Sequence, residues 1–119
     1  MARFLFVYRN SSESYGTMSP EEMQQMLQKW NAWITEGLRQ GWMLDAGDGL
    51  KNEGRVVNAK KVVSDGPFIE LKEIVGGFSI VQADTLDAAA ELAKGCPIFQ
   101  RGGSVSVEVR PLQGYTMGR

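Results

Sequence analysis

The sequence predicts an α+β fold of the ferredoxin-like βαββαβ type, with a short hairpin inserted in its middle. Two observations carry this prediction. Two segments repeat apolar residues at helical spacing, and short β-branched runs lie before, between and after them. The 119 residues suit a single domain, which we expect to span residues 1–119, with residues 113–119 as a loose tail.

The first strand is expected at residues 4–8 and is apolar on both faces. Phe4, Phe6 and Tyr8 occupy one face, while Leu5 and Val7 occupy the other. A strand of this kind is normally covered on both faces. Because the helices of a ferredoxin-like fold cover only one face of the sheet, we expect a second copy of the chain to cover the other, in a symmetric homodimer.

The first helix is expected to begin after Ser19 and to end near Gly41. Ser19, Pro20 and Glu22 match an N-cap, a first-turn proline and a capping box. Apolar residues then repeat at helical spacing at Met23, Met26, Leu27, Trp30, Ile34 and Leu38. This spacing favours a helix packed on a sheet over a platform for a cofactor.

Shorter segments complete the predicted fold. Strands are expected at residues 42–50 and 77–81, with a hairpin formed by residues 55–57 and 61–63 between them. Capping and punctuation residues indicate that a second helix covers residues 85–94, with four small or apolar residues facing inward: Leu86, Ala89, Ala90 and Ala93.

The last strand is expected at residues 104–110, where valines alternate with polar residues, and Pro111 is expected to end it. Its polar face carries Ser106, Glu108 and Arg110. This face either lines a cavity, with Ser106 as a substrate-binding residue, or is the exposed side of an edge strand.

The bulk composition excludes several classes of function. Thirteen basic and fourteen acidic residues give a net charge of −1, which provides no basic stripe for nucleic acid. The single cysteine, Cys96, forms no intrachain disulfide, so we expect a reducing, cytoplasmic location and a packing role for the thiol. No apolar run approaches the roughly 20 residues that span a bilayer, so no membrane association is expected.

The chain contains no histidine. This removes the usual acid–base residue near neutral pH and the commonest metal ligand, and with them Ser-His-Asp, Cys-His and histidine-zinc chemistry. Neither a Rossmann nor a P-loop glycine pattern occurs, so no nucleotide is expected. We therefore predict no cofactor and no metal.

The densest polar segment begins at Asp65-Gly66-Pro67-Phe68. Gly66 precedes a proline that fixes its own φ, so this turn is stiff and holds Asp65 in a defined direction. Asp65 is either a catalytic proton acceptor or simply caps a local amide in its own turn.

Glu70, Lys72 and Glu73 follow closely. In a helical turn Glu70 and Glu73 share a face, whereas in an extended segment Glu70 and Lys72 do. Two neighbouring carboxylates would raise one pKa and give a proton donor beside an acceptor, and Lys72 would anchor an anionic substrate. The alternative is a solvated, charged loop.

Two glycine-containing segments are further candidates for binding. Gly76-Gly77 either lets a ligand approach the backbone or marks a bulge at the start of a strand. Asp48 lies in an acidic, glycine-rich segment whose spacing does not match a calcium loop. Pairing of the neighbouring strands would bring Asp48 close to Asp65, and we include Asp48 and Gly76 among the candidate substrate-binding residues.

These residues resemble those of the YCII-related proteins, and within them the DGPF-domain subgroup, over roughly residues 2 to 112. The match is carried by Asp65-Gly66-Pro67-Phe68, Glu70, Lys72-Glu73 and Gly76-Gly77-Phe78, with support from residues 19–22, 47–50 and 103–111. The resemblance implies a dimeric α/β barrel built from ferredoxin-like protomers. It also implies uncharacterised bacterial relatives, some encoded beside extracytoplasmic-function sigma factors and a few regarded as enzymes acting on small molecules.

The wider YCII group is thought to use a His–Asp pair, which this histidine-free chain does not have. Two hypotheses follow. The first is a cofactor-free enzyme with carboxylate acid–base chemistry on a small organic molecule, in which Asp65 accepts a proton and Glu73 or Glu70 donates one. The second is a non-enzymatic dimer that binds a small molecule or a partner, in a pathway linked to sigma-factor signalling.

Overall fold

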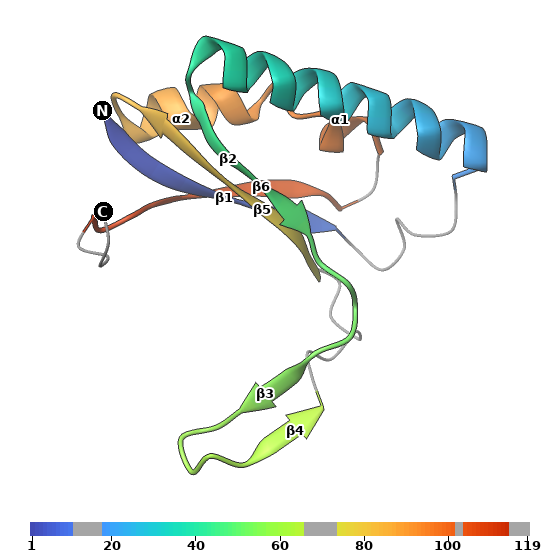
Figure 1. The fold of residues 1–119 in the computed structure, drawn as a ribbon, viewed down its shortest axis with the longest axis vertical. Helices are drawn as coiled ribbons and strands as arrows, with labels where there is room; N and C mark the ends of the chain where they lie inside the picture. Colours follow the sequence, from blue (N-terminus) through green and yellow to red (C-terminus); the bar gives the residue numbers. More distant parts are fainter. Residues whose placement is uncertain (11–17, 66–73, 102–103, 115–119) are drawn as a thin grey trace.

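The structure is a computed structural model that describes residues 1–10, 18–65, 74–101 and 104–114. Its centre is a four-stranded antiparallel sheet with the strand order β2-β5-β1-β6. The long helix α1 and the shorter helix α2 lie on the same side of this sheet (Figure 1). The elements of this layer pair are β1 (Ala2–Asn10), α1 (Pro20–Gln40), β2 (Met43–Gly49), β5 (Ile74–Ala83), α2 (Leu86–Ala93) and β6 (Ser106–Pro111).

This arrangement confirms the predicted ferredoxin-like α+β fold. The chain passes through β1, α1 and β2, then through β5, α2 and β6, and β5 and β1 become the two inner strands. Each helix connects two strands between which a third strand is inserted, which is the split βαβ arrangement. The predicted hairpin is present as β3 (Arg55–Val57) and β4 (Val63–Asp65) between β2 and β5.

Helix α1 has the predicted ends. The Ser19 side chain accepts a hydrogen bond from the Glu22 amide, the Glu22 side chain accepts one from the Ser19 amide, and Gly41 ends the helix with φ 89°. The predicted apolar stripe is only partly buried. Trp30 and Ile34 pack on the core, as does Trp33, whereas half of the stripe is exposed: Met23, Leu27 and Leu38.

The core is aromatic where α1 crosses the sheet. Phe6 and Tyr8 of β1 are buried, and their side chains meet Trp30 and Trp33 of α1. The Tyr8 and Trp30 rings lie edge to face with centroids 4.9 Å apart, and Trp42 extends the cluster beside Trp33. Edge-to-face pairs of this kind contribute about 1 kcal/mol each beyond the area they bury.

Helix α2 is capped by the Thr85 side chain, which accepts a hydrogen bond from the Ala88 amide. Ala89 and Ala93 are buried as predicted, but Leu86 is half exposed, so its predicted inward orientation is wrong. The short 3-10 helix η2 (Pro97–Arg101) follows and buries Ile98 under α1. Cys96, just before η2, is also buried, which confirms its packing role.

The second face of the sheet carries apolar residues that the helices do not cover. Leu5 pairs with Ile80 and Val7 pairs with Phe78, and all four side chains are partly exposed. An ion pair between Arg9 and Glu108 flanks them, with a 2.8 Å separation. The strand predicted to be apolar on both faces is therefore covered on one face by helices and open on the other.

Candidate functional site

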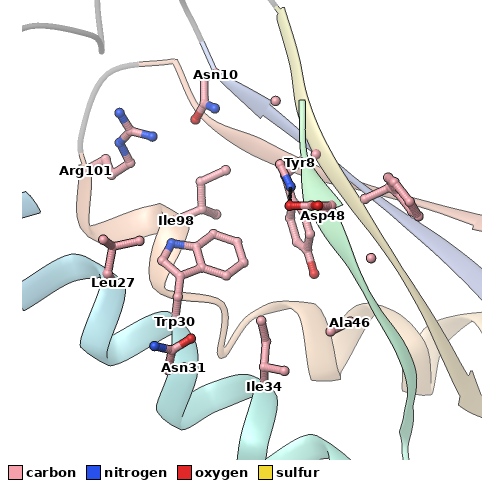
Figure 2. A pocket seen from close by; sticks show the side chains of 15 residues that line it. Tyr8, Asn10, Leu27, Trp30, Asn31, Ile34, Ala46, Asp48, Ile98 and Arg101 are labelled. Carbon is pink, nitrogen blue, oxygen red and sulfur yellow. Dashed lines mark hydrogen bonds between the residues drawn. The ribbon is translucent and has the colours of Figure 1, made fainter. Parts of the chain in front are cut away.

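A cavity of about 340 Å³ opens between α1 and one end of the sheet. Figure 2 shows its lining side chains, which come from α1, from the ends of β1 and β2, and from η2. The residues of β5 that contribute are Gly76, Gly77 and Phe78. Clefts of this size at the junction of several elements are the usual place for small-molecule binding.

One face of α1 forms the apolar side of the cavity. Leu27, Trp30, Asn31 and Ile34 recur at the spacing that places them on one side of a helix, and Ile98 of η2 lies opposite them. The Trp30 indole lies centrally among these side chains in Figure 2. Aromatic and aliphatic walls of this kind favour the burial of a planar or apolar ligand body.

Four polar residues interrupt this lining: Asn10 at the end of β1, Asn31 on α1, Asp48 on β2 and Arg101 at the end of η2. In the view of Figure 2, Arg101 and Asp48 lie on opposite sides of the Trp30 indole. The cavity therefore has a cationic side chain toward one side and a carboxylate toward the other. Such a distribution suits a ligand with polar groups at two ends.

Asp48 is held by its own turn. Its Oδ1 accepts a hydrogen bond of 2.8 Å from the Gly49 amide, and Asp45 Oδ1 accepts a similar one from the Gly47 amide. These hydrogen bonds fix the directions of the two carboxylates. The Asp48 carboxylate lies in the cavity lining, where a carboxylate is chemically able to accept a proton or to bind a donor group on a ligand.

A chain of two hydrogen bonds links β1, β5 and β2 at the wall of the cavity. The Tyr8 hydroxyl donates to Ser79 Oγ at 2.8 Å, and Ser79 Oγ donates to the Ala46 carbonyl at 2.7 Å. Burial, only partly offset by the hydrogen bond with Ser79, raises the pKa of Tyr8 far above its ordinary value of 10.0. Tyr8 is therefore a neutral wall residue rather than a proton acceptor at neutral pH.

Glycines let β2 and β5 approach closely at the cavity wall. Gly47 has φ 67°, and a Cβ there would lie 1.8 Å from the Phe78 carbonyl oxygen. A Cβ on Gly77 would lie 2.8 Å from the Asp48 carbonyl oxygen. Gly76 is skipped where the pairing moves from Tyr8–Gly77 to Arg9–Val75, so it is a bulge residue that also lines the cavity. Of the two alternatives considered for Gly76-Gly77, the bulge is therefore present, although β5 begins earlier, at Ile74, and the approach of a ligand to this backbone stays a prediction.

The structure brings only part of the predicted site together. Asp48 and Gly76 both line the cavity. Ser106 lies on β6, opposite Arg9, and does not line the cavity. Residues 66–68, Glu70, Lys72 and Glu73 lie outside the described residues.

Asp65 lies at the end of β4, away from the cavity lining. Its side chain is 95 % exposed, and its carboxylate lies 3.6 Å from the Arg55 guanidinium in a solvent-exposed ion pair. The proximity of Asp48 and Asp65 that strand pairing was expected to produce does not occur, because β2 pairs with β5 while β4 pairs with β3.

Several cavity residues were not singled out from the sequence as site residues. These are Tyr8, Asn10, Asn31 and Arg101, together with Trp30, which was assigned to the core. One signal was available: Asn31 is a polar residue on the helix face that Leu27, Trp30 and Ile34 share. Asn10 and Arg101 offered no such pattern, because they are the last residues of a strand and of a short 3-10 helix whose positions in space depend on the whole fold.

Comparison with protein families identifies the chain. The YCII-related domain model matches residues 2–113. The chain belongs to the YCII-related family. A search of curated proteins found no match to this YCII-related domain.

Among the described residues, no helix is long and apolar enough to cross a membrane. In the same part of the chain, no three Cys, Asp or Glu residues lie together in a group that could hold a metal ion.

Proposed function

We propose that this YCII-related domain binds a small organic molecule in the cavity under α1 and transfers a proton to or from it without a cofactor. The observation that carries the proposal is the position of Asp48, a carboxylate in the rim of a cavity whose α1 side is aromatic and aliphatic. Asp48 is exposed at this rim, so a ligand in the cavity can reach its carboxylate. The reaction class that fits is an isomerisation or elimination started by proton abstraction.

The acid–base partner of Asp48 is proposed to be one of the two glutamates that follow Asp65 in the sequence. Glu73 directly precedes β5, and the β5 residue Gly76 lines the cavity, which supports Glu73 as the proton donor, with Glu70 as the other candidate. Lys72 is proposed as an anchor for an anionic group of the substrate. Asp65 is kept as the competing proton acceptor, so that a direct comparison with Asp48 decides between them.

The alternative function is binding of a small molecule without catalysis, in which a signalling partner recognises the ligand-bound protein. The position of Asp65 favours it, because an exposed carboxylate paired with Arg55 has a structural explanation that needs no substrate. Under this alternative, replacing Asp48 weakens binding, and no turnover of any bound compound is expected.

The first experiment asks whether the cavity binds ligands. A library of small carboxylic acids, phenols and neutral aromatic compounds is screened by thermal shift, since a ligand at 100 times its Kd stabilises the native state by about 2.7 kcal/mol. Binding is then followed by tryptophan fluorescence. Trp30→Phe should abolish the fluorescence response because Trp30 lines the cavity, whereas Trp42→Phe, the matched control outside the lining, should keep it. A response that Trp42→Phe removes and Trp30→Phe keeps would contradict the proposed site.

The second experiment separates the two proton acceptors. For a compound that is turned over, Asp48→Asn should lower turnover at least about a hundredfold, which is typical for loss of a general base. Asp65→Asn is the matched control with the same chemical change on the hairpin. A hundredfold loss in Asp65→Asn with normal turnover in Asp48→Asn would move the base to Asp65. Binding without turnover in every variant would support the non-enzymatic alternative.

We also propose the finer assignments that the sequence suggested: membership of the DGPF subgroup, a cytoplasmic location and a homodimeric α/β barrel. The open sheet face supports the homodimer, because Leu5, Val7, Phe78 and Ile80 form a partly exposed apolar patch in one protomer. Sedimentation velocity at micromolar concentration should find a dimer, and Val7→Glu should dissociate it. A monomeric wild-type chain would contradict this assembly.

A further inference from the structure

The β3–β4 hairpin projects away from the four-stranded sheet and its helices (Figure 1). Its strands carry three valines and the connection between them a fourth, and all four are exposed. Their exposed fractions lie between 48 and 62 %: Val56, Val57, Val62 and Val63. Exposed valines of this density are unusual on a small water-facing element, since solvent-facing strands normally alternate with polar residues.

The pairing register distributes these valines over both faces of the hairpin. Val57 lies directly opposite Val63, and Val56 lies opposite Ser64. Because neighbouring residues of a strand point to opposite faces, Val57 and Val63 share one face, while Val56 lies on the other, and Val62 directly precedes β4 in the connection. Each face of the hairpin therefore carries at least one exposed valine, and neither face is entirely polar.

An isolated two-stranded hairpin is at best marginally stable in water. Here the turn is well formed, since Asn58 Oδ1 accepts hydrogen bonds from the amides of Lys60 and Val62. The Arg55–Asp65 ion pair at its open end is too exposed to contribute much. The hairpin therefore has a well-formed turn, a regular register and exposed valines on both faces. These features are expected of an element that gains stability by docking on another surface.

The charge of the hairpin indicates what it docks on. Residues 51–65 contain four basic residues and two acidic ones, a charge of +2, in a chain whose net charge is −1, so the remaining residues carry −3. The basic residues are Lys51, Arg55, Lys60 and Lys61. A basic, apolar hairpin and an acidic remainder within one chain are complementary between two copies of that chain.

We propose that the β3–β4 hairpin is an arm that docks on a second copy of this chain. In a twofold assembly each protomer donates its arm and receives the other, so both hairpins become covered. The arm emerges at the cavity: Gly49 lines it, and the next residue, Leu50, donates its amide to the Gly76 carbonyl at 2.9 Å. Because the arm begins at the cavity rim of its own protomer, docking of the arm on the partner also holds that rim in place.

Chemical coupling tests this contact directly. Chains labelled with ¹⁵N are mixed with unlabelled chains and treated with a carbodiimide, which joins neighbouring amines and carboxylates. We expect peptides in which Lys60 or Lys61 of one isotope is joined to an Asp or Glu of the other isotope. Lys60→Gln with Lys61→Gln should abolish those products. Couplings of the two lysines that occur only within one isotope would overturn the proposal.

Association measurements give the second test. Val57→Thr with Val63→Thr removes the cross-strand apolar pair of one face, and separately Val56→Thr with Val62→Thr removes the other two valines, while both double variants keep the β-branched shape. At least one pair should raise the dissociation constant of the assembly tenfold or more, and the affected pair identifies the docked face. If both double variants associate like the unchanged chain, the arm makes no contact with the second copy, and the proposal fails.

These outcomes remain separate from those for the open sheet face. A chain whose assembly depends on Val7 but not on the valine pairs would keep the sheet-face homodimer and reject the arm. An assembly that loses affinity on substitution of the valine pairs supports the arm whether or not the cavity binds a ligand.

Discussion

The β2–β5 and β3–β4 strand pairs lie in the same stretch of chain but differ in two properties, the regularity of their pairing and the burial of their side chains. The β2–β5 pairing has two register shifts and a glycine at positive φ, yet Met43 and Val81 in it are buried. The β3–β4 pairing is regular over three successive residue pairs, yet its valines are exposed. Regular local pairing therefore does not predict burial, and an irregular pair persists where packing against a helix stabilises it.

The largest expected effect is at Gly47, the irregular point of β2. Gly47→Ala should lower the free energy of unfolding by about 3 kcal/mol, because a side chain is strained at φ 67° and its Cβ would collide with the Phe78 carbonyl oxygen. Urea denaturation measures the change. Gly41→Ala is the matched control, since Gly41 has φ 89° with no atom within 4 Å of its added Cβ, and it should cost about 1 kcal/mol. Equal costs would show that the wall of the cavity relaxes freely.

One substitution at two valines compares the regions directly. Val81→Ala should lower the free energy of unfolding by about 2 kcal/mol, because Val81 is completely buried in β5. Val57→Ala in the hairpin should cost less than about 0.5 kcal/mol when both are measured in dilute, monomeric protein. A cost at Val57 as large as that at Val81 would mean that the hairpin packs on its own chain.

The third prediction concerns alkaline pH and is smaller. Burial raises the pKa of Cys96 from 9.0 to about 12, and burial also raises that of Tyr8. For groups whose pKa is higher in the folded state, the stabilisation is complete below the unfolded pKa and is lost as pH rises toward the folded one. For Cys96, stability should thus fall by about 1 kcal/mol between pH 9 and pH 10.

Urea midpoints recorded between pH 7 and pH 10 measure that fall, with Cys96→Ala as the variant in which the Cys96 contribution disappears. The comparison uses the slope of stability against pH, so the packing cost of the substitution does not affect it. An unchanged slope in Cys96→Ala would show that the thiol does not titrate differently in the folded chain.

The smallest expected effect is at the end of the hairpin. Asp65→Asn removes an exposed ion pair with Arg55, so the free energy of unfolding should change by less than about 0.5 kcal/mol. Thermal denaturation at low and high salt measures it, and the small effect should vanish at high salt. A loss above 1 kcal/mol would show that Asp65 holds together more than its own strand pair.

The helices and the order of the elements along the chain could be predicted from sequence because their signals are local. Ser19, Glu22 and Gly41 specify both ends of α1 through hydrogen bonds and a positive φ that involve only nearby residues. The hairpin was likewise recognisable from its valines around Asn58. The exposed stretch of α1 and the outward orientation of Leu86 were not predictable, because helical periodicity identifies a face but not the length of sheet beneath it.

The cavity could be predicted only in part. Asp48 and Gly76 were found because glycine and aspartate mark irregular backbone, and irregular backbone frequently lies at sites. Asn10 and Arg101 were missed because they are separated by ninety residues and meet only when β1 and η2 are placed at the same end of the sheet.

The sequence by itself determined the element order, the helix caps, the family and the absence of histidine chemistry, all of which depend on residue identity and short-range spacing. The segment beginning at Asp65 carried the resemblance to the family, but tertiary structure placed Asp65 on an exposed hairpin and placed Asp48 in the cavity lining. Strand pairing decided this, because β5 pairs with β2 and leaves β4 to pair with β3 alone. Such long-range pairing is set by packing over the whole sheet, which no local motif specifies.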